Sequence, residues 1–166
     1  MPFQPGHSED VSIRASLIAL TPEAVEAIQG EQAVCHRFPF RVGAESRRGW
    51  QGLWTDAERR VPHTEPLNHL YLREPVHSRW PYIARGHFLI DHQGGRFYLV
   101  DRGTEQGTWV SGQQVGGGYE GGHATLRDQD VIAIGAETSP YLFEFRTSAS
   151  VAWRPPRGTN QTLALS

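Results

Sequence analysis

The side chains in this sequence that could bind a metal or carry redox chemistry do not form a recognised pattern. Eight histidines are present, but none are spaced as His-x-His or His-x-x-x-His, the spacings that bring two imidazoles onto one ion. His87 and His92 are five residues apart, so on one extended strand their side chains would point to opposite faces. We therefore expect no metal site and no cofactor.

Nucleophilic and acid–base catalysis are equally poorly supported. Asp128 and Asp130 could pair as catalytic carboxylates, but in a turn before a strand such residues more often accept hydrogen bonds from backbone amides. Cys35 is the only cysteine and lies in an apolar run, so we expect a buried core residue and no disulfide. The chain has no lysine and no Gly-x-Ser-x-Gly sequence, which excludes a Walker lysine, a Schiff base and that serine nucleophile. The sequence does not predict an enzyme.

The composition is that of one folded domain without a strong charge bias. Of 166 residues, 38% are hydrophobic, and the net charge of −2 gives no general attraction to nucleic acid or to an anionic membrane. No run of eighteen apolar residues and no signal-peptide pattern is present, so we expect a cytoplasmic protein. We divide the chain into a flexible leader (1–10), a folded domain (11–146) and a C-terminal tail (147–166).

Short alternating segments separated by glycine and proline predict a β-sandwich with one helix. Thr21 is a good helix N-cap, Pro22 suits the first turn, and Gly30 can close the helix. Residues 45–66 are polar and rich in proline and arginine, which indicates a long loop that is either an interaction loop or partly disordered. The expected strands cover residues 12–20, 33–42, 70–72, 87–91, 96–101, 108–110, 131–134 and 141–146. The second of these is broken briefly by Pro39, which suggests an edge strand or a bulge.

Seven segments between residues 38 and 146 occur in an order and spacing that can be compared with known motifs. The segments are residues 38–43, Asn68-His69-Leu70, Ala84-Arg85-Gly86-His87-Phe88, 97–108, Val110-Ser111-Gly112, 126–132 and Gly135. Together they resemble the motifs of the forkhead-associated (FHA) domain family. The resemblance implies an all-β, SMAD/FHA-type sandwich of about eleven strands with one short N-terminal helix. It also implies that loops at one end of the sandwich bind phosphothreonine peptides.

The departures from the family pattern fall at the positions that the resemblance assigns to ligand binding. Phosphate is implied to be held by an arginine and a serine, but this chain has Ala44 and Ala84 at those two positions. A methyl group neither donates a hydrogen bond nor carries a charge. The positions implied to hold the peptide backbone are also changed, and the carboxylate among them would repel phosphate. These positions are Glu105, Gln106 and Ser111.

Residues that we assign to building the loops, in contrast, match the family. The sequence therefore predicts a non-catalytic protein–protein interaction module, on an intact FHA scaffold, with weakened or lost phosphothreonine binding. We expect a bacterial signalling or scaffolding role and a protein partner, with or without a phosphorylated threonine. The oligomeric state is not predicted. The matching residues are Gly43, His87, Asp101, Gly107 and Thr108.

Several alternatives stay open. Arg85 and Arg47 could replace the missing phosphate ligands, because a guanidinium fits phosphate, or both could be solvated surface residues. The two alanines could be natural or engineered, and the further departures favour a natural origin. An enzyme with a divergent site would need a deep pocket of ionisable groups. Three tryptophans near arginines, Trp50, Trp54 and Trp80, either form a binding hot spot or anchor the long loop.

Overall fold

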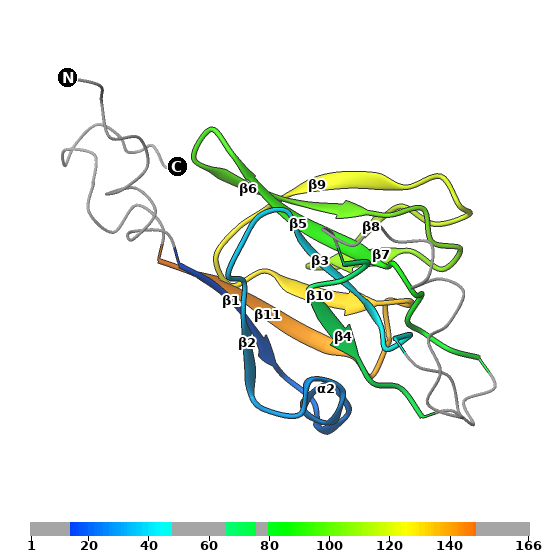
Figure 1. Ribbon diagram of the computed structural model, residues 1–166. Helices are drawn as coiled ribbons and strands as arrows, with labels where there is room; N and C mark the ends of the chain where they lie inside the picture. The colour runs from blue at the N-terminus through cyan, green and yellow to red at the C-terminus, as the bar shows by residue number, and fades with distance from the viewer. Residues whose placement is uncertain (1–13, 48–65, 76–79, 149–166) are drawn as a thin grey trace, which may run out of the picture.

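Two β-sheets and one short helix make up the computed structural model, which describes residues 14–47, 66–75 and 80–148 (Figure 1). The expected all-β sandwich of eleven strands with one short N-terminal helix is confirmed for these residues. The elements are β1 (Ala15–Ala19), α2 (Pro22–Ile28), β2 (Gln32–Val34), β3 (Phe40–Ala44), β4 (Leu70–Leu72), β5 (Phe88–Gln93), β6 (Arg96–Asp101), β7 (Thr108–Val110), β8 (Gln113–Val115), β9 (Gly122–Leu126), β10 (Val131–Ile134) and β11 (Leu142–Thr147).

The strand order places the ends of β3, β5, β6 and β7 where they can share one loop region. The six-stranded sheet has the order β2-β1-β11-β10-β7-β8, and the five-stranded sheet has the order β4-β3-β5-β6-β9. All strand pairs are antiparallel except β3 and β4, which are parallel. Consequently the N-terminal end of β5 lies between the C-terminal ends of β3 and β6.

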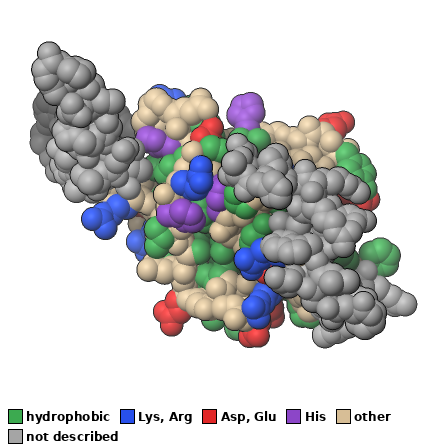
Figure 2. Space-filling model, viewed as in Figure 1, with side chains coloured by type: hydrophobic (Ala, Val, Ile, Leu, Met, Phe, Trp, Pro, Cys, Tyr) green, Lys and Arg blue, Asp and Glu red, His purple; other side chains and the backbone are tan. Residues whose placement is uncertain are grey.

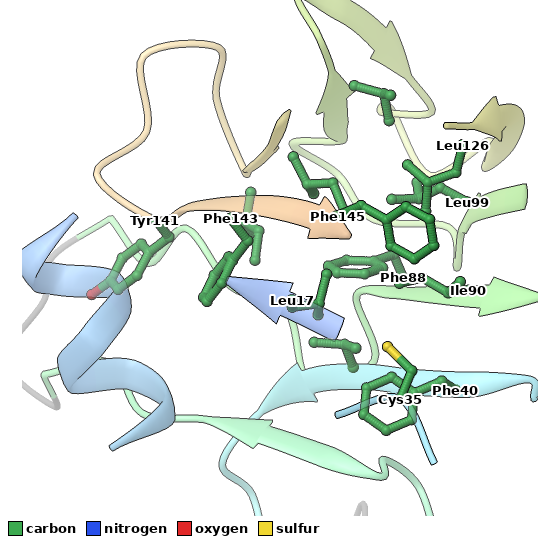
Figure 3. Packing of buried hydrophobic residues seen from close by; sticks show 14 of the residues in the cluster. Leu17, Cys35, Phe40, Phe88, Ile90, Leu99, Leu126, Tyr141, Phe143 and Phe145 are labelled. Carbon is green, nitrogen blue, oxygen red and sulfur yellow. The ribbon is translucent and has the colours of Figure 1, made fainter. Parts of the chain in front are cut away.

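The core lies between the two sheets and is built from the inward-facing positions of the alternating strands. In β11, Phe143 and Phe145 are buried, whereas the residues between and beside them are at least partly accessible. Figure 3 shows these rings packed against Phe88 of the opposite sheet and Leu17 of β1. Each such side chain stabilises the fold by about 1.5–3 kcal/mol when fully buried. The period-two pattern therefore fixes which face of each strand points into the sandwich.

The helix α2 begins as expected and ends one residue earlier than expected. The Thr21 hydroxyl accepts a hydrogen bond from the Ala24 amide at 3.1 Å, and Pro22 occupies the first turn. The left-handed residue at the C-terminus is Gln29, with φ of 59°, rather than Gly30. The Gln29 and Gly30 amides bond to carbonyls of the last turn, so this end is closed by backbone geometry that a non-glycine residue adopts.

The single strand expected over residues 33–42 was wrong. The structure splits this segment into β2, which pairs with β1 in one sheet, and β3, which pairs with β4 and β5 in the other. Pro39 lies in the connection, where its lack of an amide hydrogen removes no ladder bond. The chain therefore crosses between the two sheets near Pro39, where the sequence predicted only a brief break within one strand.

Two strands, β8 and β9, were not expected from the sequence. Both adjoin the glycine-rich segment 116–122, and most of their side chains are exposed, so neither shows a hydrophobic alternation. Pairing with β7 and β6 supplies their backbone hydrogen bonds instead. Tertiary contacts, rather than local propensity, determine these strands.

Several sequence-based expectations fall outside the described residues. These are the leader 1–10, Trp50, Trp54, most of the 45–66 loop, and the tail beyond Ser148. Cys35 is buried as expected, and its burial raises the pKa of the thiol to about 12. The helix in the described part of the chain is too short and too polar to span a bilayer.

Candidate functional site

The loops that follow β3, precede β5 and follow β6 are joined by direct hydrogen bonds at one end of the sandwich. Ala44, at the end of β3, donates its amide hydrogen to the Ala84 carbonyl at 2.8 Å. The Ala84 amide donates to Nδ1 of His87 at 2.9 Å, and Nε2 of His87 lies 2.9 Å from the Gly107 carbonyl. The positions singled out in three separate sequence segments therefore form one contiguous region, which we call the loop end.

His87 links two of these loops from inside the protein. Its side chain is fully buried, and Nδ1 accepts a hydrogen bond, so the proton must be on Nε2, which donates to Gly107. Burial lowers the pKa of His87, although the hydrogen bond to Gly107 and the charge of Asp101 oppose this shift. The imidazole is therefore neutral at pH 7. Its two ring nitrogens are both occupied by these contacts with the loops.

Asp101 organises the loop that leads from β6 to β7. One carboxylate oxygen accepts the amides of Gly103 and Thr104, each at 2.9 Å, and the other accepts the hydroxyls of Thr104 and Thr108, each at 2.8 Å. The Thr104 hydroxyl in turn accepts the Gly107 amide at 2.8 Å. All of this lies in the interior, since Asp101 is only 3% exposed. Asp101, Gly107 and Thr108 are therefore joined in one hydrogen-bonded network within this loop.

Gly43 allows the loop before β5 to approach the end of β3. A Cβ atom at this position would lie 2.0 Å from the Arg85 carbonyl oxygen, which no side chain could tolerate. The same carbonyl accepts a hydrogen bond from the Asn68 side chain at 2.7 Å, and Arg102 donates to the Asn68 oxygen at 2.7 Å. The guanidinium of Arg102 also lies 3.0–3.3 Å from where a Cβ of Gly86 would be. Asn68 and Arg102 thus hold the backbone around Arg85.

Sequence reasoning did not assign a role to three of the residues that position this loop. Asn68 and Arg102 occurred within segments that resemble the family motifs, which was a usable signal, but Glu74 lies outside these segments. The Glu74 carboxylate accepts the amides of Tyr82 and Ile83 at 2.8 and 3.1 Å, and so fixes the segment that leads into Ala84. These contacts join residues that are separated in sequence, and only the fold brings them together.

The two arginines considered as substitute phosphate ligands differ in their surroundings. Arg47 forms two side-chain hydrogen bonds with Glu45, at 2.7 and 2.9 Å, and its guanidinium carbon lies 4.2 Å from the centre of the Tyr71 ring. The hydrogen bond from Arg47 is the main reason that the pKa of Glu45 is lowered. Arg85 is exposed, and within the described part of the chain its side chain makes no hydrogen bond or ion pair. Of the two, Arg85 is therefore the one available to a ligand.

Glu105 and Gln106 lie at the loop end, whereas Ser111 does not. Glu105 is exposed and is hydrogen-bonded to the Tyr119 hydroxyl, which raises the pKa of that tyrosine. Gln106 donates to the Pro81 carbonyl at 3.3 Å. Ser111 follows the opposite end of β7, where its hydroxyl donates to Asp130 at 2.8 Å. The structure therefore brings every predicted ligand position together except Ser111.

Other predicted chemistry can be checked against the same contacts. Asp130 accepts the Arg127 amide at 2.7 Å and Asp128 accepts the Thr147 amide at 2.8 Å, so the expected backbone-binding role of both carboxylates is confirmed. Within residues 14–47, 66–75 and 80–148, no cluster of histidine, cysteine, aspartate or glutamate could hold a metal ion. Trp80 is 79% exposed, so it does not anchor a loop against the described domain.

Comparison with known proteins agrees with this reading of the fold. Residues 65–135 match the sequence model of the FHA domain family, and the sandwich of eleven strands is FHA-like. This interval contains Asn68, Ala84, His87 and Asp101. No curated protein matches the sequence.

Solved structures to which this chain is similar include three of low sequence identity. EmbR of Mycobacterium tuberculosis, in complex with a low-affinity phosphopeptide, has 18% identity and a TM-score of 0.48; the alignment covers 80% of this chain and only 24% of EmbR. The FHA domain of CT664 from Chlamydia trachomatis has 19% identity, a TM-score of 0.46, and coverage of 80% and 96%. The FHA domain of an Arabidopsis thaliana hypothetical protein has 18% identity, a TM-score of 0.47, and coverage of 87% and 92%.

Proposed function

We propose that this FHA-like domain is a non-catalytic protein–protein interaction module in which phosphothreonine binding is weakened or lost. One observation carries the proposal: Ala44 and Ala84, at the positions where the FHA pattern has phosphate-binding side chains, are adjacent and joined by a 2.8 Å backbone hydrogen bond. The framework around them is complete, since His87, Asp101 and Gly43 make the contacts that build the loops. The loop end thus keeps the framework of a ligand-binding surface but lacks the two side chains that were expected to bind an anion.

The size of the expected loss follows from the chemistry of the missing groups. A charge-assisted hydrogen bond contributes about 1.5–3 kcal/mol, so removing two such bonds weakens binding by roughly 100-fold or more. Glu105 is exposed at the same end of the sandwich, and its carboxylate adds repulsion toward a phosphate dianion. Both effects act against a phosphorylated ligand.

Exposed aromatic rings near the loop end support binding that does not need phosphate. Trp80 is 79% exposed and Tyr119 is 71% exposed, and both adjoin loop-end contacts, through Pro81 with Gln106 and through Glu105 respectively. Large aromatic side chains dominate the energetics of many protein interfaces. A protein partner that covers these rings would gain apolar contact area without an anion.

A second candidate function is phosphothreonine recognition through Arg85. The observation that favours it is the exposed guanidinium without a described partner, next to Ala84. Arg47 is a weaker substitute, because a ligand would have to displace the carboxylate of Glu45 from it.

The decisive experiment is a fluorescence titration of a degenerate phosphothreonine peptide pool against three proteins. These are the native chain, the double variant Ala44→Arg/Ala84→Ser, and Arg85→Ala, with Arg127→Ala as a control for loss of an exposed arginine elsewhere. Binding gained only by the double variant supports a lost phosphate site on an intact framework. Micromolar binding by the native chain that Arg85→Ala alone abolishes supports the second candidate and contradicts the first.

A further inference from the structure

A groove of about 710 Å³ lies at the end of the sandwich opposite the loop end. Phe38 and His92 are two of the residues that line it. Phe38 precedes β3, which ends at Ala44, and His92 is near the end of β5, which begins after His87. The groove is therefore separated from the candidate phosphate positions by the length of these strands.

Apart from the buried thiol of Cys35, the ionisable side chains that line the groove are all basic. Two arginines and two histidines contribute to it, and none of the described lining residues is aspartate or glutamate. Asp91 lies next in sequence to one of these histidines, but it faces the sheet surface and is bonded to Gln93 at 2.7 Å. Figure 2 shows histidine and arginine side chains gathered on one part of the visible face. The four basic residues are Arg14, His36, Arg37 and His92.

The local excess of positive charge also affects the pKa of the neighbouring residue His69. Its pKa is lowered to about 4, first by burial and then by the positive charges of Arg37, Arg41 and His36. Nδ1 of His69 accepts the Arg41 amide at 3.0 Å, so the ring is held in place beside these cations. The positive field is thus a property of the surface around the groove and not of one side chain.

The groove also adjoins an open sheet edge with apolar side chains. Among the residues that the structure describes, strand β2 is the edge of the six-stranded sheet and pairs only with β1. The Cys35 amide and the Glu31 carbonyl bond to β1, so by alternation the backbone groups of Val34 point away from β1. Val34 is 57% exposed, and Phe38 is half-buried in the groove.

We propose that this groove binds an extended acidic segment of a partner protein, which adds to β2 as a strand and places carboxylates against Arg14 and Arg37. The backbone amide and carbonyl of Val34 supply the hydrogen bonds to the added strand, and the Val34 side chain supplies an apolar contact. Both kinds of contact are typical of strand addition. A nucleic acid is disfavoured, because it offers no strand to pair with β2 and the chain as a whole carries a net charge of −2. This surface acts independently of the loop end, so the two proposals can fail separately.

The test uses the full chain and a fluorescent peptide of about eight residues that alternates glutamate and valine, a spacing that directs the two residue types to opposite sides of a strand. We expect the double variant Arg14→Ala/Arg37→Ala to weaken binding at least tenfold. The matched control is Arg96→Ala/Arg127→Ala, which removes the same charge from a different surface groove that also contains Asp128. That control should change the affinity less than twofold.

Substitutions at Val34 separate the effect of charge on peptide binding from the effect of the lost apolar contact. Val34→Glu and Val34→Lys remove the same apolar contact from an exposed edge position and should both fold. We expect the glutamate variant to lose binding and the lysine variant to keep it. The proposal is overturned if the peptide does not bind the native chain at millimolar concentration. It is also overturned if a glutamine–valine peptide or a single-stranded oligonucleotide binds equally well, or if both arginine pairs have the same effect.

Discussion

Replacing Asp101 by asparagine tests whether the loop end is built around one buried carboxylate. The side chain accepts four hydrogen bonds at 2.8–2.9 Å, two from backbone amides and two from the hydroxyls of Thr104 and Thr108. Asparagine keeps the shape and one acceptor oxygen but turns the other oxygen into a donor, which faces two hydroxyls. Hydrogen bonds to a charged group contribute about 1.5–3 kcal/mol each, so two lost bonds, partly offset by rotation of the hydroxyls, lower the free energy of unfolding by about 3 kcal/mol.

Urea unfolding followed by circular dichroism measures this change. With a slope of about 1.5 kcal/mol per molar urea, typical of a domain this size, the midpoint should fall by about 2 M. Asp128→Asn is the matched control, because it is exposed and accepts one described hydrogen bond, from the Thr147 amide. Its free energy of unfolding should change by no more than about 0.5 kcal/mol.

A double-mutant cycle with Thr108→Val assigns the loss to the stated bond. If the Thr108 hydroxyl bonds to Asp101 as described, Thr108→Val lowers the free energy of unfolding less in the Asp101→Asn variant than in the native chain. The expected coupling energy is about 1 kcal/mol. A stability of Asp101→Asn within about 0.5 kcal/mol of the native chain would refute the idea that this carboxylate organises the loop.

Two further predictions concern the same framework and the basic surface. Gly43→Ala should prevent stable folding, because its Cβ would overlap the Arg85 carbonyl at 2.0 Å, whereas Gly30→Ala, with no atom within 4 Å, should leave the thermal midpoint nearly unchanged. The pKa of His69 is about 4 in the folded protein and about 6.5 when unfolded, so the unfolded state binds more protons between these values. Stability should therefore fall as the pH drops below 6.5, by roughly 1 kcal/mol after allowance for solvent screening, and this loss should be absent in His69→Asn. Thermal unfolding at pH 7 and pH 4.5 checks both proteins.

The sandwich could be predicted from the sequence where the signal was local. Thr21 and Pro22 marked the start of the only described helix, and the alternation in β6 and β11 indicated strands with one buried face. The break at Pro39 could be predicted, but the change from one sheet to the other could not, because a proline also occurs at an edge or a bulge within one strand. Strands β8 and β9, beside Gly116, were not predicted, because their side chains are mostly polar and show no apolar alternation. Only their pairing with neighbouring strands defines them.

The candidate site could be predicted in part. Motif order located His87 and the alanine positions, and hydrogen bonds place these residues together. The roles of Glu74 and Arg102 could not be predicted, because a charged residue in a polar segment has many possible partners and sequence does not select one. Ser111 matched a motif position but lies at the other end of β7, so agreement in spacing did not imply proximity in space.

The way His87 joins two loops has a consequence for how the domain can change over evolutionary time. The imidazole forms hydrogen bonds with two backbone groups, the Ala84 amide and the Gly107 carbonyl. This link therefore does not depend on the side chain at position 84. Residues that contact a ligand can therefore be exchanged at little cost to folding. Lineages with this architecture can drift between partners, or acquire new ones, through a few substitutions on a frame that stays the same.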